Sequence, residues 1–251
     1  YNAERVEVVR AALMAGASRY TRNSSSADIK DYRVAPADRT TNGLDRRFGA
    51  GQLNIFNSYQ VVAAGEQNSS EDQPAKGGLI TSLGFDYDSA FGGLSGSNAA
   101  ATYRIPSASG PRQLTAALVW NLSIKGGTST AFDGTPTFYD LGLRLYDVTN
   151  PNNWILVDSS ESAAENTENL WRRLDSDKSY ALRVIRGAAQ AAFKWDYGFA
   201  WHVTPIAPLI VDPIVLPDAE GGMAYPVKTL AASGGQGPYA WSVVSGSLPQ
   251  G

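Results

Sequence analysis

The sequence predicts a mostly β protein, with a jelly-roll-like antiparallel β-sandwich between a helical first segment and a short strand-rich last segment. Three observations predict this. Apolar residues recur at helical spacing near the start, residues 77–204 change to two-residue alternation, and prolines mark a joint after residue 204. The composition, 43% hydrophobic and 18% charged, is typical of a globular protein.

The first segment, residues 1–67, begins with a predicted helix over about the first twenty residues. Asn2 is a plausible N-cap, and Glu4 falls in the first turn, where the helix dipole favours an acid. Five apolar residues follow one another at steps of three or four and mark the expected buried face: Val6, Val9, Leu13, Ala17 and Tyr20.

A polar stretch, residues 21–47, separates this helix from a second one predicted to start near Asn54 and to stop at Gly65. Its apolar face holds Ile55, Phe56, Tyr59, Val62 and Ala63. Two short helices cannot bury both of their apolar faces against each other alone. We therefore expect a further domain, encoded before Tyr1, to cover Val6, Val9, Leu13, Phe56 and Tyr59.

The second segment, residues 77–204, alternates between apolar and polar residues in four separate runs, with a clear turn at N-P-N-N, residues 150–153. About eight short strands in about 130 residues fit an antiparallel sandwich of jelly-roll type. The alternation predicts that six side chains face inward: Leu118, Trp120, Leu143, Leu145, Leu182 and Phe199.

The third segment, residues 205–251, starts with a joint that contains Pro205, Pro208, Pro213 and Pro217. Strand-like pieces then alternate with Gly and Pro turns. A complete immunoglobulin-type sandwich needs about 100 residues. We therefore expect a linker and the incomplete start of an Ig-like domain.

Composition also excludes several classes of function. A net charge of −3 provides no basic surface for nucleic acid. No apolar run approaches the roughly 18 residues that span a bilayer. The absence of cysteine excludes disulfides, thiolate metal sites and a cysteine nucleophile.

Two motifs in the first segment resemble the end of a subtilisin-like serine protease domain. Residues 8–17 read V-V-R-A-A-L-M-A-G-A, and residues 48–54 read F-G-A-G-Q-L-N. In that family an alanine-rich helix follows the nucleophile helix, and a G-x-G turn leads into the closing helix. The resemblance implies that residues 1–67 are the C-terminal end of a catalytic domain whose Asp, His and Ser lie before Tyr1.

The later segments resemble modules that follow such domains in secreted bacterial proteases. V-W-N at 119–121, D-L-G-L-R-L-Y-D at 140–147 and Y-A-L-R-V at 180–184 are similar to strands of the appended β-sandwich. Residues 234–251 are similar to a bacterial putative-Ig repeat.

The resemblance implies a non-catalytic C-terminal piece of a secreted subtilisin-like endopeptidase. Its sandwich would stabilise or position the upstream catalytic domain, which would act on protein or peptide substrates. The alternative is a cell-surface adhesion or carbohydrate-binding array of β-modules. The helical first segment favours the protease, because a pure adhesion array has no use for it.

No residue of this chain is predicted to be catalytic. Gly127–Ala131 reproduces the letters G-T-S-x-A, but F-D-G-T-P-T follows, so Ser129 lacks the helix and the base that the chemistry needs. His202, the only histidine, alternates away from Trp201 and Val203 and is interpreted as a polar residue on the solvated face of a strand.

No cofactor is predicted with a defined ligand set, and calcium is the one candidate metal. Its candidate ligands are carboxylates on a strand or near loop ends: Asp86, Asp88, Asp133, Asp140 and Asp147. Solvated acids and turn caps are the alternative, because no D-x-D-x-D-G loop is present. Trp154 and Trp171 are candidates for a sugar-binding platform, with an aromatic core or rim as the alternative.

Overall fold

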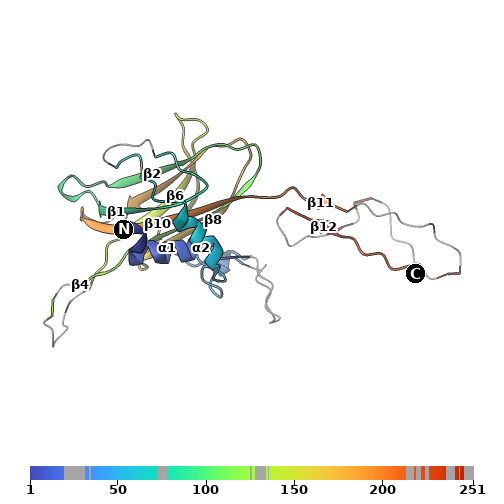
Figure 1. Ribbon diagram of the computed structural model, residues 1–251, viewed down its shortest axis with the longest axis horizontal. Helices are drawn as coiled ribbons and strands as arrows, with labels where there is room; N and C mark the ends of the chain where they lie inside the picture. Colours follow the sequence, from blue (N-terminus) through green and yellow to red (C-terminus); the bar gives the residue numbers. More distant parts are fainter. Residues whose placement is uncertain are drawn as a thin grey trace. The chain divides into compact units, whose positions relative to one another are not determined.

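The computed structural model is shown in Figure 1. It describes residues 1–19, 32–33, 35–72, 78–124, 126–127, 134, 136–212, 218, 222–223, 226–235, 241–242 and 244–245. Residues 1–205 form one compact unit and residues 206–251 a second one. The chain is mostly β, as the sequence predicts.

Among the described residues, two α-helices precede the strands. α1 spans Val6–Gly16 and α2 spans Ile55–Ala63, with short 3-10 turns at Asn2–Glu4, Pro36–Asp38 and Leu94–Gly96. Helix α1 is shorter than expected. Its last turn ends where the Arg19 guanidinium donates to the carbonyl oxygens of Ala17 (2.6 Å) and Met14 (3.1 Å), which satisfies acceptors that a helix end leaves free.

The strands of the first unit form two four-stranded antiparallel sheets and a small ribbon. Their bounds are β1 Leu83–Phe91, β2 Ala100–Ile105, β3 Arg112–Val119, β4 Ser123–Ile124, β5 Pro136–Thr137, β6 Leu141–Asp147, β7 Ile155–Ser160, β8 Thr167–Leu174, β9 Tyr180–Arg186 and β10 Trp195–Pro205. One sheet has the order β1-β10-β3-β8 and the other β2-β9-β6-β7. This order is that of a jelly roll, in which consecutive strands of the two sheets lie in opposite sheets, except for the hairpin of β6 and β7.

The two sheets enclose one apolar core. All six side chains predicted to face inward are fully buried there, which confirms the alternation in those runs. Aromatic rings fill the core between the sheets. The Tyr103 ring on β2 lies 4.8 Å from the Phe199 ring on β10, and Phe199 lies 5.5 Å from Trp201.

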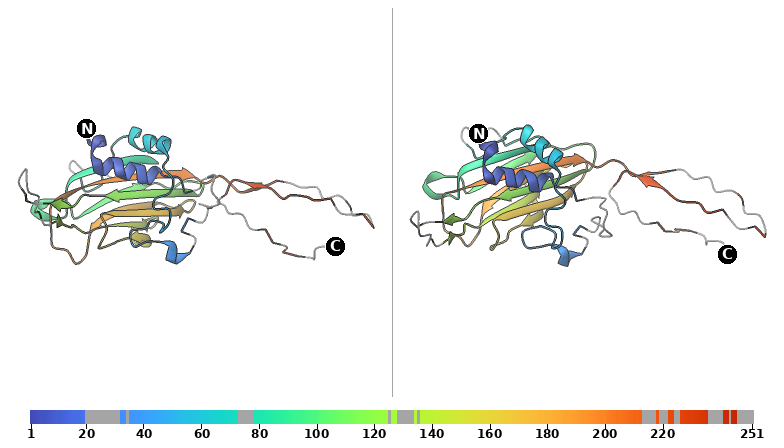
Figure 2. Two further views of the ribbon diagram at one scale, coloured as in Figure 1. Left: turned by 90° about the horizontal axis from the view of Figure 1, so that it is seen from below. Right: turned by 60° about the horizontal axis from the view of Figure 1, so that its bottom comes forward.

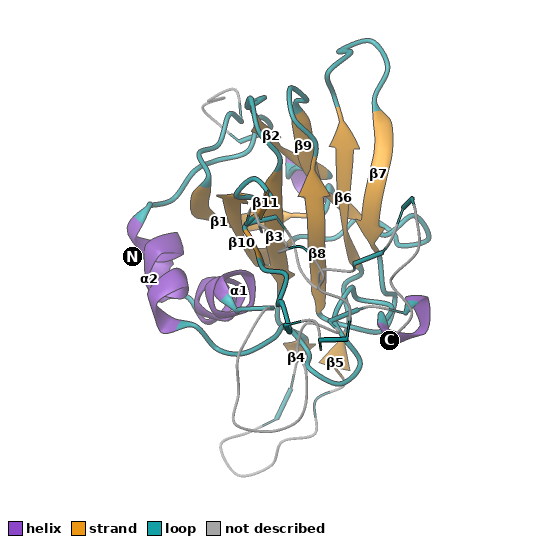
Figure 3. Ribbon diagram, turned by 90° about the vertical axis from the view of Figure 1, so that its right-hand side faces the viewer, coloured by secondary structure: helices purple, strands orange, loops and turns teal. Residues whose placement is uncertain are grey.

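Both helices lie on the outer side of sheet β1-β10-β3-β8 (Figures 2 and 3). Small and β-branched residues of α1 are buried in a second core cluster with Ala117, Val119 and Ala200 of the sheet: Val8, Ala11, Ala12 and Ala15. The sheet therefore covers a different side of α1 from most of the predicted stripe. Ala17 of that stripe is buried and Tyr20 lies outside the described residues, and the cover of the other members by a further domain stays a prediction. Val6 and Val9 are exposed and Leu13 is half-buried, because the sheet accepts the side of α1 on which alanines permit close approach.

Gly198 on β10 makes that close approach possible. A Cβ atom added there would lie 2.5 Å from the backbone of Glu7 and Val8, closer than real contacts allow. We expect Gly198→Ala to push α1 away from the sheet and to lower the free energy of unfolding by about 1–3 kcal/mol. Urea unfolding measures this. Gly110→Ala is the control, because a Cβ there meets nothing within 4 Å. Equal stability of the two variants would contradict the packing argument.

Short segments bond to the outer strands of both sheets. Gln67 N donates to Phe85 O (2.8 Å) along β1. Along β2, Ser70 N donates to Thr102 O (2.9 Å) and Ile80 N to Arg104 O (3.0 Å). Backbone groups at these two strands, which would otherwise face water, therefore have partners.

In the second unit, the strands β11 (Ile210–Val211) and β12 (Ala232–Ser233) pair antiparallel. Pro213 and Pro217 lie outside the described residues, as does most of the predicted Ig-like repeat. The expectation of an Ig-like start stays a prediction.

Candidate functional site

The exposed sides of α1 and α2, together with the turn before α2, carry several large apolar side chains. Ile55, Phe56 and Tyr59 on α2 are 63%, 67% and 67% exposed, and Leu53 just before α2 is 59% exposed. Val6 on α1 is 60% exposed. We call these five residues, together with Val9, the helical face. Large exposed apolar side chains on two helices that contact each other favour an interaction surface.

Local contacts join the two helices that carry the helical face. Asn54 caps α2, since its Oδ1 accepts from Asn57 N at 3.0 Å. The Asn57 side chain donates to the α1 carbonyl of Gly16 (3.1 Å). Gly16 itself lies against Ser58, where an added Cβ would be only 2.7 Å from the Ser58 backbone nitrogen. The end of α1 and the start of α2 are therefore packed tightly against each other.

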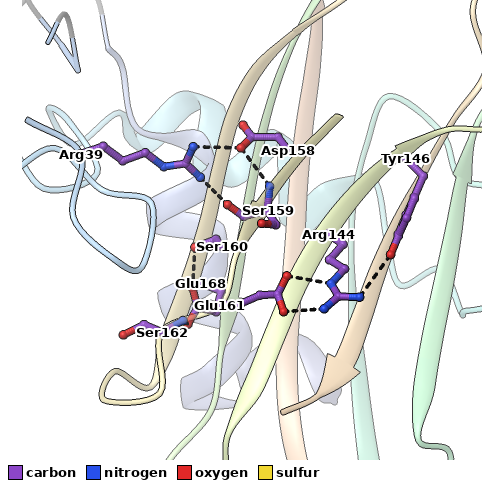
Figure 4. A network of polar contacts seen from close by, with 9 residues as sticks. All are labelled: Arg39, Arg144, Tyr146, Asp158, Ser159, Ser160, Glu161, Ser162 and Glu168. Atoms are coloured by element: carbon purple, nitrogen blue, oxygen red, sulfur yellow. Dashed lines mark hydrogen bonds and ion pairs between the residues drawn. The ribbon is translucent and has the colours of Figure 1, made fainter. Parts of the chain in front are cut away.

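The polar segment before α2 is fastened to the far edge of the sandwich (Figure 4). Arg39 forms an ion pair with Asp158 on β7 (2.9 Å) and also donates to Ser159 O. Asn42 donates to Thr167 Oγ1 at 3.0 Å, and Asn169 donates back to Asn42 O at 3.0 Å. These contacts tie residues 39–42 to both sheets.

A buried glutamate lies beneath this segment. Glu168 on β8 is fully buried and accepts from Ser160 Oγ and from Ser162 N (2.6 Å). Burial raises the pKa of Glu168 to about 8, although both hydrogen bonds act in the opposite direction. The carboxyl group therefore keeps its proton near neutral pH. Its hydrogen bonds join β8 of one sheet to the end of β7 in the other sheet.

A second buried carboxyl group connects the two sheets. Tyr103 on β2 donates to Asp86 Oδ2 on β1 (2.7 Å), and the Tyr103 and Tyr197 hydroxyls lie 2.8 Å apart. Burial raises the pKa of Asp86 to about 7, with Asp72, Glu66 and Asp88 adding to the shift. The pKa values of both tyrosines are also raised by burial.

The other calcium candidates do not converge. Burial raises the pKa of Asp88 to about 6, and its Oδ1 accepts from Ala90 N at 2.8 Å. Asp147 pairs with Lys178 (2.9 Å), and burial raises the pKa of Asp140. Asp133 lies outside the described residues. In the part of the chain that the structure describes, no three acidic or histidine residues form a group that could hold a metal ion.

Neither candidate for triad chemistry gains support. Ser129 lies outside the described residues. His202 is half-buried on the side of β10 that faces α1, and burial and Arg19 lower its pKa. Among the described residues, its imidazole makes no hydrogen bond with a serine or a carboxylate. The geometry of a general base is therefore missing around His202.

The two candidate platform tryptophans lie apart from each other. The Trp171 ring on β8 packs edge-to-face on Tyr32 at 5.1 Å. Trp154, just before β7, lies 5.8 Å from the Tyr146 ring, and the Arg104 guanidinium lies over it at 5.3 Å. They do not form one platform.

Sequence reasoning missed Glu168. A signal for it exists, because Glu168 falls in the same two-residue alternation as Leu170 and Leu174, which are fully buried on the same strand. An acid at an inward position of an apolar run indicates a buried carboxyl group that needs partners.

Comparison with known proteins adds little. No protein-family model and no curated protein sequence matches this chain. Among solved structures, the chain is similar to the Yersinia pseudotuberculosis-derived mitogen (YPM), over 41% of this chain and 84% of that one, at 13% identity and a TM-score of 0.22. So low a TM-score says nothing about the function of this chain. No helix among the described residues is long and apolar enough to span a membrane.

Proposed function

We propose that this chain is the non-catalytic C-terminal part of a secreted subtilisin-like serine endopeptidase. In this proposal the sandwich holds the catalytic domain of the same polypeptide against the helical face. The observation that carries the proposal is the helical face itself: large apolar side chains stand in water on helices whose opposite side is fixed to the sandwich.

The two subtilisin-like motifs support the proposal because they lie together. Ser18 N donates to Gln52 O (2.8 Å) and Gln52 N to Ser18 O (2.9 Å), so the end of α1 pairs with the F-G-A-G-Q-L-N turn. Gly51 in that turn has φ +105, and an added Cβ would lie 2.4 Å from Ser18 O. The turn that leads into α2 therefore needs glycine at this position.

Burial of the helical face against a folded domain would be strongly favourable. Each large apolar side chain moved from water into an interface contributes about 1.5–3 kcal/mol. Phe56 and Tyr59 lie one turn apart on α2, so one partner surface can cover both. The catalytic groups would come from the partner domain, since His202 has no catalytic neighbours among the described residues.

The test is the polypeptide that is encoded together with this chain. The residues N-terminal to Tyr1 should contain an aspartate, a histidine and a G-T-S serine, in that order. The complete polypeptide should hydrolyse casein and react with a fluorophosphonate probe, whereas residues 1–251 alone should do neither. An upstream sequence without the three catalytic residues would end the proposal and leave the adhesion array.

Docking is tested in the complete polypeptide with the double variant Phe56→Ser, Tyr59→Ser. We expect the half-life of its casein-hydrolysing activity during heating to fall tenfold or more. A loss of about 1.4 kcal/mol of interface free energy already corresponds to a factor of ten. Ile155→Ser is the matched control, since Ile155 is 56% exposed on β7, in the sheet that the helices do not cover. Equal half-lives for all three proteins would show that the helical face is not an interface.

A further inference from the structure

The outer face of sheet β2-β9-β6-β7 carries arginine and aromatic side chains in register. Leu182 and Val184 of β9 point into the core, so Ala181 and Arg183 point outward. Arg104 of β2 and Tyr146 of β6 are both paired with Ala181. Thr102 and Arg144 are both paired with Arg183. Two parallel rows of side chains therefore cross the sheet.

The second row brings two positive charges face to face. Arg144 and Arg183 are direct partners on neighbouring strands, an arrangement that is destabilising for like charges. Arg144 is neutralised by Glu161, whose two carboxylate oxygens each accept from its guanidinium at 2.7 Å. No such partner exists for Arg183 in the described part of the chain.

A carboxylate at the other end of this row, that of Glu71, is bound to Thr102. Both oxygens of Glu71 accept from Thr102, one from its backbone nitrogen and one from its hydroxyl, each at 2.7 Å. Arg183 Nε is buried and has no hydrogen-bond partner among the described residues. That buried Nε is not itself within reach of a ligand, but a guanidinium on the outer face of a sheet, with no carboxylate partner among the described residues, favours the binding of an anion.

The first row supplies an apolar platform beside this guanidinium. The Trp154 ring lies between Arg104 and Tyr146, and Ala181 beneath them is fully buried. Leu156, paired with Tyr146, extends the row and is 52% exposed. An aromatic and aliphatic row next to a cation matches a ligand with an apolar face and a carboxylate.

We propose that this face binds an acidic polysaccharide. The uronate carboxylate pairs with Arg183, and the apolar face of the sugar rings rests on Trp154 and Tyr146. A sugar chain is favoured over an extended peptide because the backbone of β2, where a peptide strand would add, already bonds to Ser70, Gly78 and Ile80. The proposal is independent of the proposed protease.

The test measures binding of residues 1–251 to alginate oligosaccharides, a mixed polyuronate, by titration calorimetry at low salt. We expect Arg183→Gln to weaken binding about tenfold or more, because it removes a charge-assisted pair. Arg183→Lys should recover only part of the loss, since lysine keeps the charge but not the planar fork. Arg173→Gln is the control: the same charge change at an exposed position of the other sheet.

Trp154→Ala, which leaves the arginines in place, should also weaken alginate binding, and neutral dextran should not bind to any of the proteins. No binding of alginate by the unmodified chain would overturn the proposal. So would equal losses for Arg183→Gln and Arg173→Gln, because the effect would then be general charge. Binding of dephosphorylated casein without binding of alginate would assign the face to an acidic protein and would also overturn it.

Discussion

Leu143→Ala is expected to lower the free energy of unfolding by about 2–5 kcal/mol, the range for removing a buried leucine and leaving a cavity. Leu143 is fully buried on β6, a central strand whose two neighbours hold its backbone in place, so the core cannot collapse easily around the gap. Urea unfolding followed by tryptophan fluorescence measures the loss, because Trp120 and Trp201 lie in the same core.

The matched control for this variant is Leu156→Ala on the next strand. Leu156 is half exposed on the outer face, so its truncation should change the free energy of unfolding by about 0.5 kcal/mol or less. A small effect of Leu143→Ala, similar to that of Leu156→Ala, would contradict the assigned face of β6.

The stability of the first unit is expected to fall between pH 5 and pH 8 because of two buried acids. The pKa of Asp86 is raised to about 7 and that of Glu168 to about 8. The folded chain therefore keeps protons that the unfolded chain has already released above about pH 4 to 4.5. Their stabilisation is complete below that range and is lost as the pH rises through the folded values.

For Asp86 the loss between pH 4 and pH 7 is on the order of 4 kcal/mol, at about 1.4 kcal/mol for each unit of pKa shift. Asp86→Asn removes the titration and keeps an acceptor for Tyr103. The variant should match the unmodified chain near pH 5 and exceed its free energy of unfolding at pH 8. The pKa of His202 is lowered, so its contribution to stability increases as the pH rises. This contribution is the same in both proteins, and the difference between their free energies of unfolding therefore reports Asp86 alone.

Urea unfolding at several pH values checks this, with Asp175→Asn as the control. The Asp175 side chain is 64% exposed, so its replacement should have only a small effect on the free energy of unfolding. Parallel curves for Asp86→Asn and the unmodified chain would show that Asp86 ionises as freely in the folded state as in the unfolded state.

The sandwich could be predicted from sequence because two-residue alternation determines which face of a strand is buried. Leu143 and Leu145, or Leu182 and Val184, cannot change faces without exposing the whole run. The start of α2 was also predictable, since Asn54 is a strong cap followed by apolar residues.

The buried side of α1 could not be predicted in the same way. Its sequence offers two apolar sides, and the larger side chains, Val6 and Val9, point to the side that the sheet does not cover. What decides is the partner surface: Gly198 and Ala200 of β10 leave room for Val8 and Ala11 at close range. Such complementarity between segments almost 200 residues apart leaves no periodic signal in either.

The same limit applies to the sites. The buried Glu168 is paired with Ser160 only because β7 and β8 close one side of the sandwich. The outward arginine row exists only because strand order places Arg183 between Thr102 and Arg144. Sequence reasoning could nominate single residues, such as Asp86 and Trp154, but not their partners.

The segments that bond to the outer strands have a consequence for how copies of this chain meet in concentrated solution. With residues 65–67 on β1 and residues 70 and 78–80 on β2, a neighbouring molecule finds few free backbone groups there with which to continue either sheet. A chain cut after residue 67 would lose the cover of β1 and, together with it, α1 and α2. The bared strand and the bared apolar sheet would then lie side by side, which is the surface from which fibrous aggregates grow.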